Sequence, residues 1–163
     1  MAANIRFLNP DALTKPPTYT QVVEVIGPRR TVYISGQLAT GVDGALVSRD
    51  FRAQAVRVFE NLKAALAAVG ASFKDVVKVN SYLSDVAHLP ILRDVRAGYL
   101  NAAALPASTT LGGLSFAREG ALLEVEVVAV LPAKEPRKRS KASAKTRAVR
   151  RGRKAAKARG KRR

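Results

Sequence analysis

The sequence contains no cysteine and only one histidine, His88. The absence of cysteine excludes disulfides, a thiolate nucleophile and any zinc site built on thiolates. His88 lies at the expected start of a helix, where capping or exposure explains it. A histidine-based metal site is therefore excluded, and a Ser-His-Asp triad is unsupported. We predict a protein without a metal site, whose chemistry depends on other side chains.

Long apolar stretches are also missing. No run approaches the roughly 18 apolar residues that a membrane-spanning helix needs. The first ten residues contain no apolar segment of the length found in signal peptides. These absences predict a soluble cytoplasmic protein with no membrane partner.

Acidic residues are scarce in only one part of the chain. Residues 1–133 hold 13 Lys and Arg against 11 Asp and Glu, a net charge of +2, whereas residues 134–163 hold 16 against one, a net charge of +15. No aromatic residue follows Phe116. A segment of this composition cannot bury enough apolar surface to offset its ordering entropy. We predict a folded domain over 1–133 and a disordered basic tail over 134–163.

Apolar periodicity predicts the secondary structure of the domain. Two-residue alternation between turn residues predicts strands over 5–8, 19–26, 31–38, 73–83 and 121–131, with a further strand through Ser108. Spacings of three and four predict helices over 50–69 and from Pro90 to before Pro106. This order predicts an α+β fold, in which a mixed sheet carries two helices on one face.

The turn residues also predict which strands are neighbours. Gly27 and Pro28 separate the strands over 19–26 and 31–38, which indicates a hairpin. Within the second of these strands, Gly36 permits the close approach of another backbone or of a ligand.

The strand over 121–131 has one apolar face, and its other face carries Glu124 and Glu126. The glycine-rich connection before it indicates that the segment 105–114 pairs with this strand or lies close to it. The hydroxyls of residues 108–110 are then expected near the Glu124 carboxylate, as a polar cluster at strand ends.

The domain carries a series of short motifs in a fixed order. They are 18–21 (TYTQ), 32–37 (VYISGQ), Gln54 with Asn61-Leu62, 70–72 (GAS) followed by 75–78 (DVVK), Pro106-Ala107, and 123–126 (LEVE). Together, over about residues 5–132, they resemble the RidA/YjgF family of reactive-intermediate deaminases. The set is specific, although each motif alone is weak.

The resemblance implies a chorismate-mutase-like core and a homotrimer whose clefts between subunits bind small carbonyl or imine compounds. It also implies hydrolysis of 2-imino acids or their enamine tautomers to 2-keto acids and ammonia, with neither metal nor cofactor. Glu124 and Tyr19 are then the expected catalytic residues, and Gly36 is an expected substrate contact.

Three pocket positions depart from the deaminase pattern. Ser108 stands where the resemblance places the arginine that anchors the substrate carboxylate, and one neutral hydroxyl cannot replace a charged, bidentate fork. Arg93 stands at an asparagine position, and Thr110 at a cysteine or small-residue position. We expect all three to contact the substrate, and Arg93 to be able to supply the missing positive charge from the second helix.

The same residues also have structural explanations, so the sequence leaves open whether the domain is an enzyme. Glu124 and Glu126 can simply form the solvated face of a strand. Tyr19 can pack with its hydroxyl exposed. Arg93 can be solvated or paired. A Ser/Thr run needs no function in a strand.

The tail carries a second functional signal. Lys and Arg side chains neutralise phosphates and release counterions, which gives salt-sensitive binding of nucleic acid without sequence preference. Within the tail, we expect Arg150, Arg151, Arg153 and Lys154 to contact nucleic acid. Three tails on a trimer would add avidity, whereas the lack of aromatic residues argues against base stacking. The alternative function is a non-catalytic trimeric platform that binds nucleic acid; a merely solubilising tail is the simplest explanation.

Overall fold

The computed structural model describes residues 4–133. Its elements are β1 (Asn4–Leu8), β2 (Val22–Ile26), β3 (Arg29–Gln37), α1 (Phe51–Ala68), η1 (Phe73–Asp75), β4 (Val76–Leu83), η2 (Val86–His88), α2 (Leu89–Ala97), β5 (Ala107–Leu111) and β6 (Leu123–Pro132). The predictions for the tail, including its cluster at Arg150 to Lys154, lie outside the described residues. No helix within 4–133 is long and apolar enough to cross a membrane.

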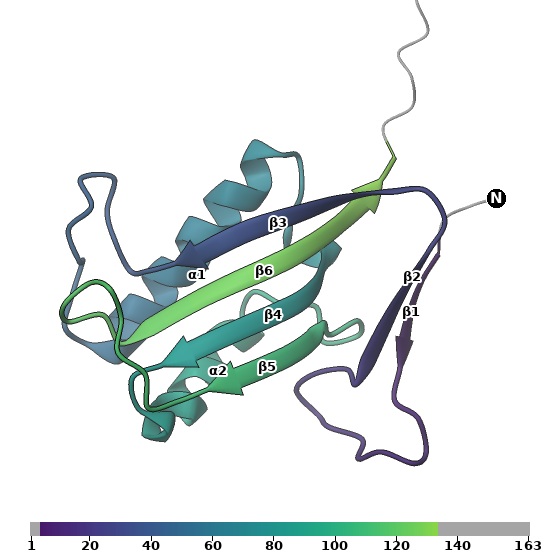
Figure 1. Ribbon diagram of the computed structural model, residues 1–163, viewed down its shortest axis with the longest axis horizontal. Helices are drawn as coiled ribbons and strands as arrows, with labels where there is room; N and C mark the ends of the chain where they lie inside the picture. The colour runs from purple at the N-terminus through teal and green to yellow at the C-terminus, as the bar shows by residue number, and fades with distance from the viewer. Residues whose placement is uncertain (1–3, 134–163) are drawn as a thin grey trace, which may run out of the picture. The chain divides into compact units, whose positions relative to one another are not determined.

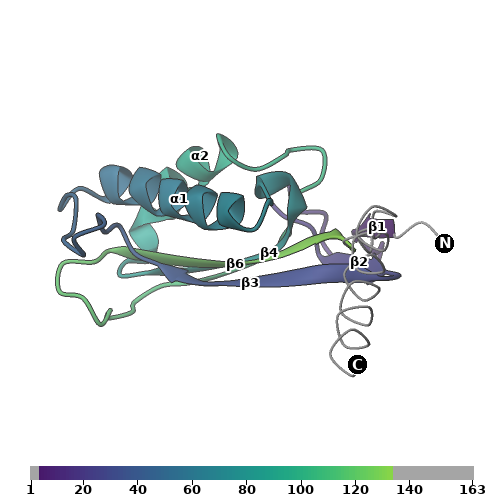
Figure 2. The ribbon, with the colours of Figure 1, turned by 90° about the horizontal axis from the view of Figure 1, so that it is seen from above.

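Four strands form the main sheet, in the order β3-β6-β4-β5 (Figure 1). The β4–β5 pair is parallel, and the β3–β6 and β4–β6 pairs are antiparallel, so the sheet is mixed. Both helices lie on one side of the sheet and leave its other side uncovered (Figure 2). The predicted α+β fold with two helices on one face is confirmed.

Helix α1 forms where its apolar spacing predicts it. The Asp50 side chain caps the first turn by accepting a hydrogen bond of 2.8 Å from the backbone of Ala53. Gly70, at a φ of +72°, ends the helix in the left-handed conformation that favours glycine. The buried stripe of the helix includes Phe59 and Leu62, which are fully enclosed between the helix and the sheet. Helix packing therefore fixes one face of β4 and β6 as core.

The predicted hairpin between 19–26 and 31–38 is wrong. Strand β2 pairs with β1 in a separate two-stranded ladder, and β3 pairs with β6. Gly27 and Pro28 lead the chain from one sheet to the other instead of folding it back. Residues 19–21 belong to the preceding loop, so β2 begins only at Val22.

The predicted pairing of 105–114 with 121–131 is also wrong. Strands β5 and β6 both pair with β4, from its two sides. Helix α2 provides the crossover that a parallel β4–β5 pair requires. The loop after β5 then carries the chain across to the far side of β4, so one strand separates the two segments.

Candidate functional site

The carboxylate of Glu124 lies directly over Gly36. A register shift between Ile34 and Gln37 marks an irregularity in β3 at this point, opposite the start of β6. A Cβ atom added to Gly36 would overlap Glu124 Oε1 and lie 2.6 Å from its Cδ. A larger residue at position 36 would therefore force the end of the Glu124 side chain to move. Glu124 is half-buried and has no hydrogen-bond or ion-pair partner within residues 4–133.

The next carboxylate on the same face, Glu126, accepts two hydrogen bonds through one of its oxygens. Its Oε1 accepts hydrogen bonds from Asn80 Nδ2 at 2.8 Å and from the Tyr82 hydroxyl at 3.0 Å. The bond to Glu126 raises the pKa of Tyr82; burial and the charges of Glu126 and Glu124 raise it further. Tyr82 therefore stays protonated as a donor. Within residues 4–133, Glu124 is therefore the one of these two glutamates whose carboxylate has no hydrogen-bond donor.

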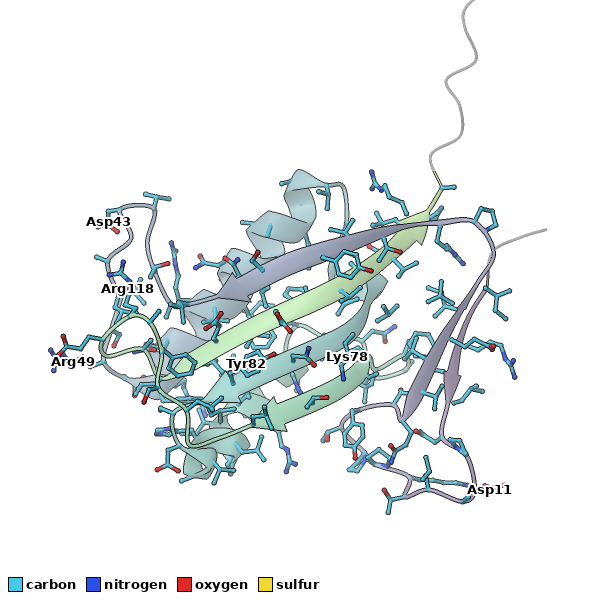
Figure 3. All side chains as sticks on the ribbon, in the orientation of Figure 1. Asp11, Asp43, Arg49, Lys78, Tyr82 and Arg118 are labelled. Carbon is cyan, nitrogen blue, oxygen red and sulfur yellow. The ribbon has the colours of Figure 1, made fainter. Side chains whose placement is uncertain are left out.

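These groups lie on the uncovered face of the sheet. Lys78 and Tyr82 both extend from β4 on this side (Figure 3), and Lys78 Nζ donates to Thr109 Oγ1 at 2.7 Å. A shallow hollow of about 270 Å³ on this face is lined by Tyr33, Ser35, Lys78, Asn80, Glu126 and neighbouring backbone. The face thus combines fixed polar groups with exposed apolar surface, such as Tyr33, which is 80% exposed.

Ser108 and Thr110 point to the opposite side of the sheet. Their partners on β4 are Val79 and Ser81, which are buried beneath the helices. Because paired residues on adjacent strands share a face, the two hydroxyls lie on the helix side, whereas Glu124 pairs with Tyr82 on the open side. One protomer therefore does not bring Ser108 or Thr110 to Glu124, contrary to the expectation from sequence.

Tyr19 lies close to the start of β5. The adjacent Thr20 donates its hydroxyl to the Leu105 carbonyl at 2.5 Å and its backbone N–H to the Pro106 carbonyl at 3.2 Å. These bonds hold the 18–20 loop against the segment that leads to Ser108. Tyr19 is half-buried and belongs to the β5 side of the molecule, away from the Glu124 corner.

The guanidinium that reaches Ser108 belongs to Arg96 and not to Arg93. Arg96 Nη1 donates to Ser108 Oγ at 3.1 Å, and Nη2 donates to the Thr18 carbonyl at 3.3 Å. Arg96 is only 5% exposed, whereas Arg93 is exposed. Arg96 was not among the site residues expected from the sequence. The signal was its position four residues after the buried Leu92, on the apolar face of α2.

A buried amide, that of Gln54, holds the backbone that leads to Glu124. Gln54, which is fully buried, donates to the carbonyls of Ser48 and Gly120 at 2.9 Å each and accepts from the Leu122 N–H at 2.9 Å. It thereby fixes the residues that lead into β6. On the same helix, Asn61 donates to the carbonyls of Leu38 and Thr40 and holds the chain that leaves β3.

Gln54→Leu should lower the free energy of unfolding by about 2–5 kcal/mol, because three backbone groups in part-buried hydrogen bonds lose their partner. Urea unfolding of both proteins measures the change. Gln21→Leu is the control: its amide donates to Thr14 in a loop, and we expect a change within about 0.5 kcal/mol. Equal losses in the two variants would contradict the assigned role of Gln54.

These features define a class of protein, a small α+β domain whose mixed sheet is open on one face. On that face the Glu124 carboxylate lies over Gly36, where β3 pairs with β6. The sequence matches the family described as Endoribonuclease L-PSP over residues 11–131. The chain belongs to this family, which includes the RidA/YjgF proteins. The resemblance seen in the short motifs is thereby confirmed.

Several relatives share this domain. A 2-iminobutanoate/2-iminopropanoate deaminase from Dermatophagoides farinae is 33% identical over 114 residues, which cover 69% of this chain and 85% of that protein. The Rid-family protein YyfB from Yersinia pestis superposes with a TM-score of 0.68 at 30% identity, over 78% of this chain and 99% of its own. RidA from an Antarctic Psychrobacter has a TM-score of 0.57 at 35% identity, over 72% and 92%.

Proposed function

We propose that this protein is a cytoplasmic hydrolytic deaminase of small 2-imino acids or their enamine tautomers. The observation that carries the proposal is the Glu124 carboxylate, which is half-buried, has no partner within the described residues and is held over Gly36. A carboxylate placed in this way can accept a proton from water. The 33% identity to a 2-iminobutanoate/2-iminopropanoate deaminase supports the substrate class.

In the proposed reaction, Glu124 takes a proton from a water molecule as the water oxygen bonds to the imine carbon. Glu124 returns this proton to the imine nitrogen, which gives the neutral carbinolamine. The C–N bond then breaks as the C=O bond forms, and the hydroxyl proton passes through the Glu124 carboxylate to the departing nitrogen, so that ammonia leaves. The net change is one imino acid and one water to one 2-keto acid and one ammonia. No electrons are exchanged, and the step needs only general acid–base chemistry from the protein.

The substrate contacts proposed for this reaction are Tyr19, Gly36, Arg93, Ser108 and Thr110. Ser108 and Thr110 lie on the helix side of the sheet, and Glu124 lies on the open side. A single protomer therefore does not complete the site. This separation supports a homotrimer in which the reacting cleft lies between neighbouring subunits, with Glu124 from one and the β5 groups from the next.

Release of 2-keto acid from an imino acid generated in situ by an amino acid oxidase tests the proposal. The wild type should accelerate release above the uncatalysed hydrolysis in buffer, and Glu124→Ala should abolish the acceleration. A wild-type rate equal to that in buffer would contradict the proposal. Activity that appears only in Ser108→Arg would show that the pocket is intact but serves other ligands in the wild type.

A second candidate function rests on the charge of the tail. Residues 134–163 carry a net charge of +15 and include Arg150, Arg151, Arg153 and Lys154. We propose that this segment binds nucleic acid through phosphate contacts and that the trimeric domain serves as a platform for three tails.

Deletion of residues 134–163 separates the two functions. Affinity for double-stranded DNA and for RNA should fall by at least about 100-fold in the truncated protein, and the steep salt dependence should disappear. Fluorescence anisotropy at several salt concentrations measures both. Deaminase turnover should be unchanged by the deletion. Equal nucleic-acid affinity with and without the tail would contradict the second function.

A further inference from the structure

Arg96 is a buried cation without a counterion. It is 5% exposed, and its two hydrogen bonds go to neutral acceptors, the Ser108 hydroxyl at 3.1 Å and the Thr18 carbonyl at 3.3 Å. The ion pairs that the described part of the chain forms all involve other residues, so no carboxylate lies within 4.0 Å of this guanidinium.

A guanidinium in this position favours an anion. Arginine stays protonated in proteins and offers five donors, of which the two bonds use two. A charge taken out of water is costly unless it is paired. Burial lowers the pKa of Arg96, and the neighbouring charge of Arg93 lowers it further. Two positive charges, Arg93 and Arg96, therefore lie near each other here, and no carboxylate within residues 4–133 pairs with Arg96.

A small pocket opens beside this charge. It has a volume of about 130 Å³ and lies between the 17–18 loop, helix α2 and the segment that leads to β5. Arg93 and Arg96 supply its cationic part, and Pro17, Leu100 and Leu105 supply apolar walls. Pockets for drug-sized ligands measure about 300–1,000 Å³, so only a molecule of a few heavy atoms fits here.

We infer that this pocket binds a small organic carboxylate, with the carboxylate on the Arg96 fork and its alkyl part against Leu100 and Leu105. Ser108 and Thr18 orient the guanidinium by accepting its hydrogen bonds. Arg93 adds a second positive charge at the mouth. The apolar walls favour an organic acid over an inorganic anion, which would leave them without a partner. Within one protomer the pocket lies on the opposite side of the sheet from Glu124. It shares Arg93 with the substrate contacts proposed above, and butanoate, which has no C=N bond to hydrolyse, reports binding here separately from turnover.

Calorimetric titration of the full-length protein with butanoate and with its neutral isostere butanamide tests the inference. Butanoate should bind at least about tenfold more tightly than butanamide, because charge-assisted bonds to arginine are the stronger ones. Arg96→Met should weaken butanoate binding by at least about tenfold. Arg93→Gln should weaken it less, by about two- to fivefold, since this side chain is exposed. Arg49→Gln, which removes an exposed charge in another loop, is the matched control and should bind like the wild type.

The comparison of butanoate with butanamide on the wild type tests the inference even if Arg96→Met fails to fold. Equal affinity for butanoate and butanamide, or no detectable binding of butanoate to the wild type, would overturn the inference. Butanoate binding that Arg49→Gln weakens as much as Arg96→Met would also overturn it, because the charge of the whole molecule would then explain the effect. Because butanoate is not a substrate of the proposed reaction, failure of its binding and failure of deaminase turnover are separate results.

Discussion

Glu124→Gln should reduce kcat/KM for 2-iminobutanoate by about 10²–10⁴-fold, the range expected for loss of a general base. Glutamine keeps the size of the side chain and its position over Gly36, but it cannot accept a proton from water. Stopped assays of 2-oxobutanoate release measure the change. Thermal unfolding should be little altered, because the Glu124 carboxylate has no partner to lose within residues 4–133.

Glu126→Gln is the matched control for this prediction. Glu126 lies two residues away on the same face of β6, but its Oε1 accepts from Asn80 and Tyr82. We expect its substitution to lower stability, by about 1–3 kcal/mol for charge-assisted bonds, and to change kcat/KM by no more than about threefold. Equal losses of activity in Glu124→Gln and Glu126→Gln would contradict a specific role of Glu124.

Gly36→Ala should reduce kcat/KM by about 100-fold, because misplacing a reacting group by 1 Å can cost that much. The backbone of Gly36 has no positive φ, so the effect is steric. The new methyl group would overlap Glu124 Oε1 and force the carboxylate to move. The same assay measures the loss, and circular dichroism checks that the fold is retained.

Gly98→Ala is the control for the glycine substitution. An added Cβ there meets only the Val95 carbonyl, at 3.4 Å, and the residue ends α2 away from Glu124. We expect no more than a twofold change, as for other surface positions. A double-mutant cycle gives a second check: in the Glu124→Gln background, Gly36→Ala should cost little further activity, since coupled residues are not additive. Full additivity would show that Gly36 acts independently of Glu124.

Local pattern predicted α1 and β6 well, because each has a continuous apolar face of the right period. It also predicted β4 and α2, but β4 begins at Val76 and not at Phe73, and α2 ends at Ala97, well before Pro106. The pairing of strands was predicted less well. Gly27 and Pro28 looked like a hairpin turn, but the neighbours of β2 and β3 are chosen by packing over the whole domain. A glycine-rich connection indicates that the chain turns, but it does not indicate how many strands the connection crosses. The position of β4 between β5 and β6 was therefore not predicted.

The candidate site was likewise predicted only in part from the sequence. Gly36 and Glu124 were both singled out from sequence, but their contact depends on the pairing of β3 with β6, 88 positions apart in the chain. Arg93 was chosen as the helix charge that faces the pocket. Arg96 is the residue that reaches Ser108, because the turn of α2 points one of these arginines into the protein and the other into solvent.

By itself, the sequence determined the fold class, the helix that covers the sheet and the concentration of charge in residues 134–163, since composition and local periodicity specify these directly. Only the tertiary structure decided that, within residues 4–133, Glu126 accepts hydrogen bonds and Glu124 does not. It also decided that Ser108 faces the helices and that Arg96 is buried with no carboxylate partner among the same residues. The physical reason is that burial and pairing depend on which distant segments meet, and alternation along one strand shows only that two faces differ.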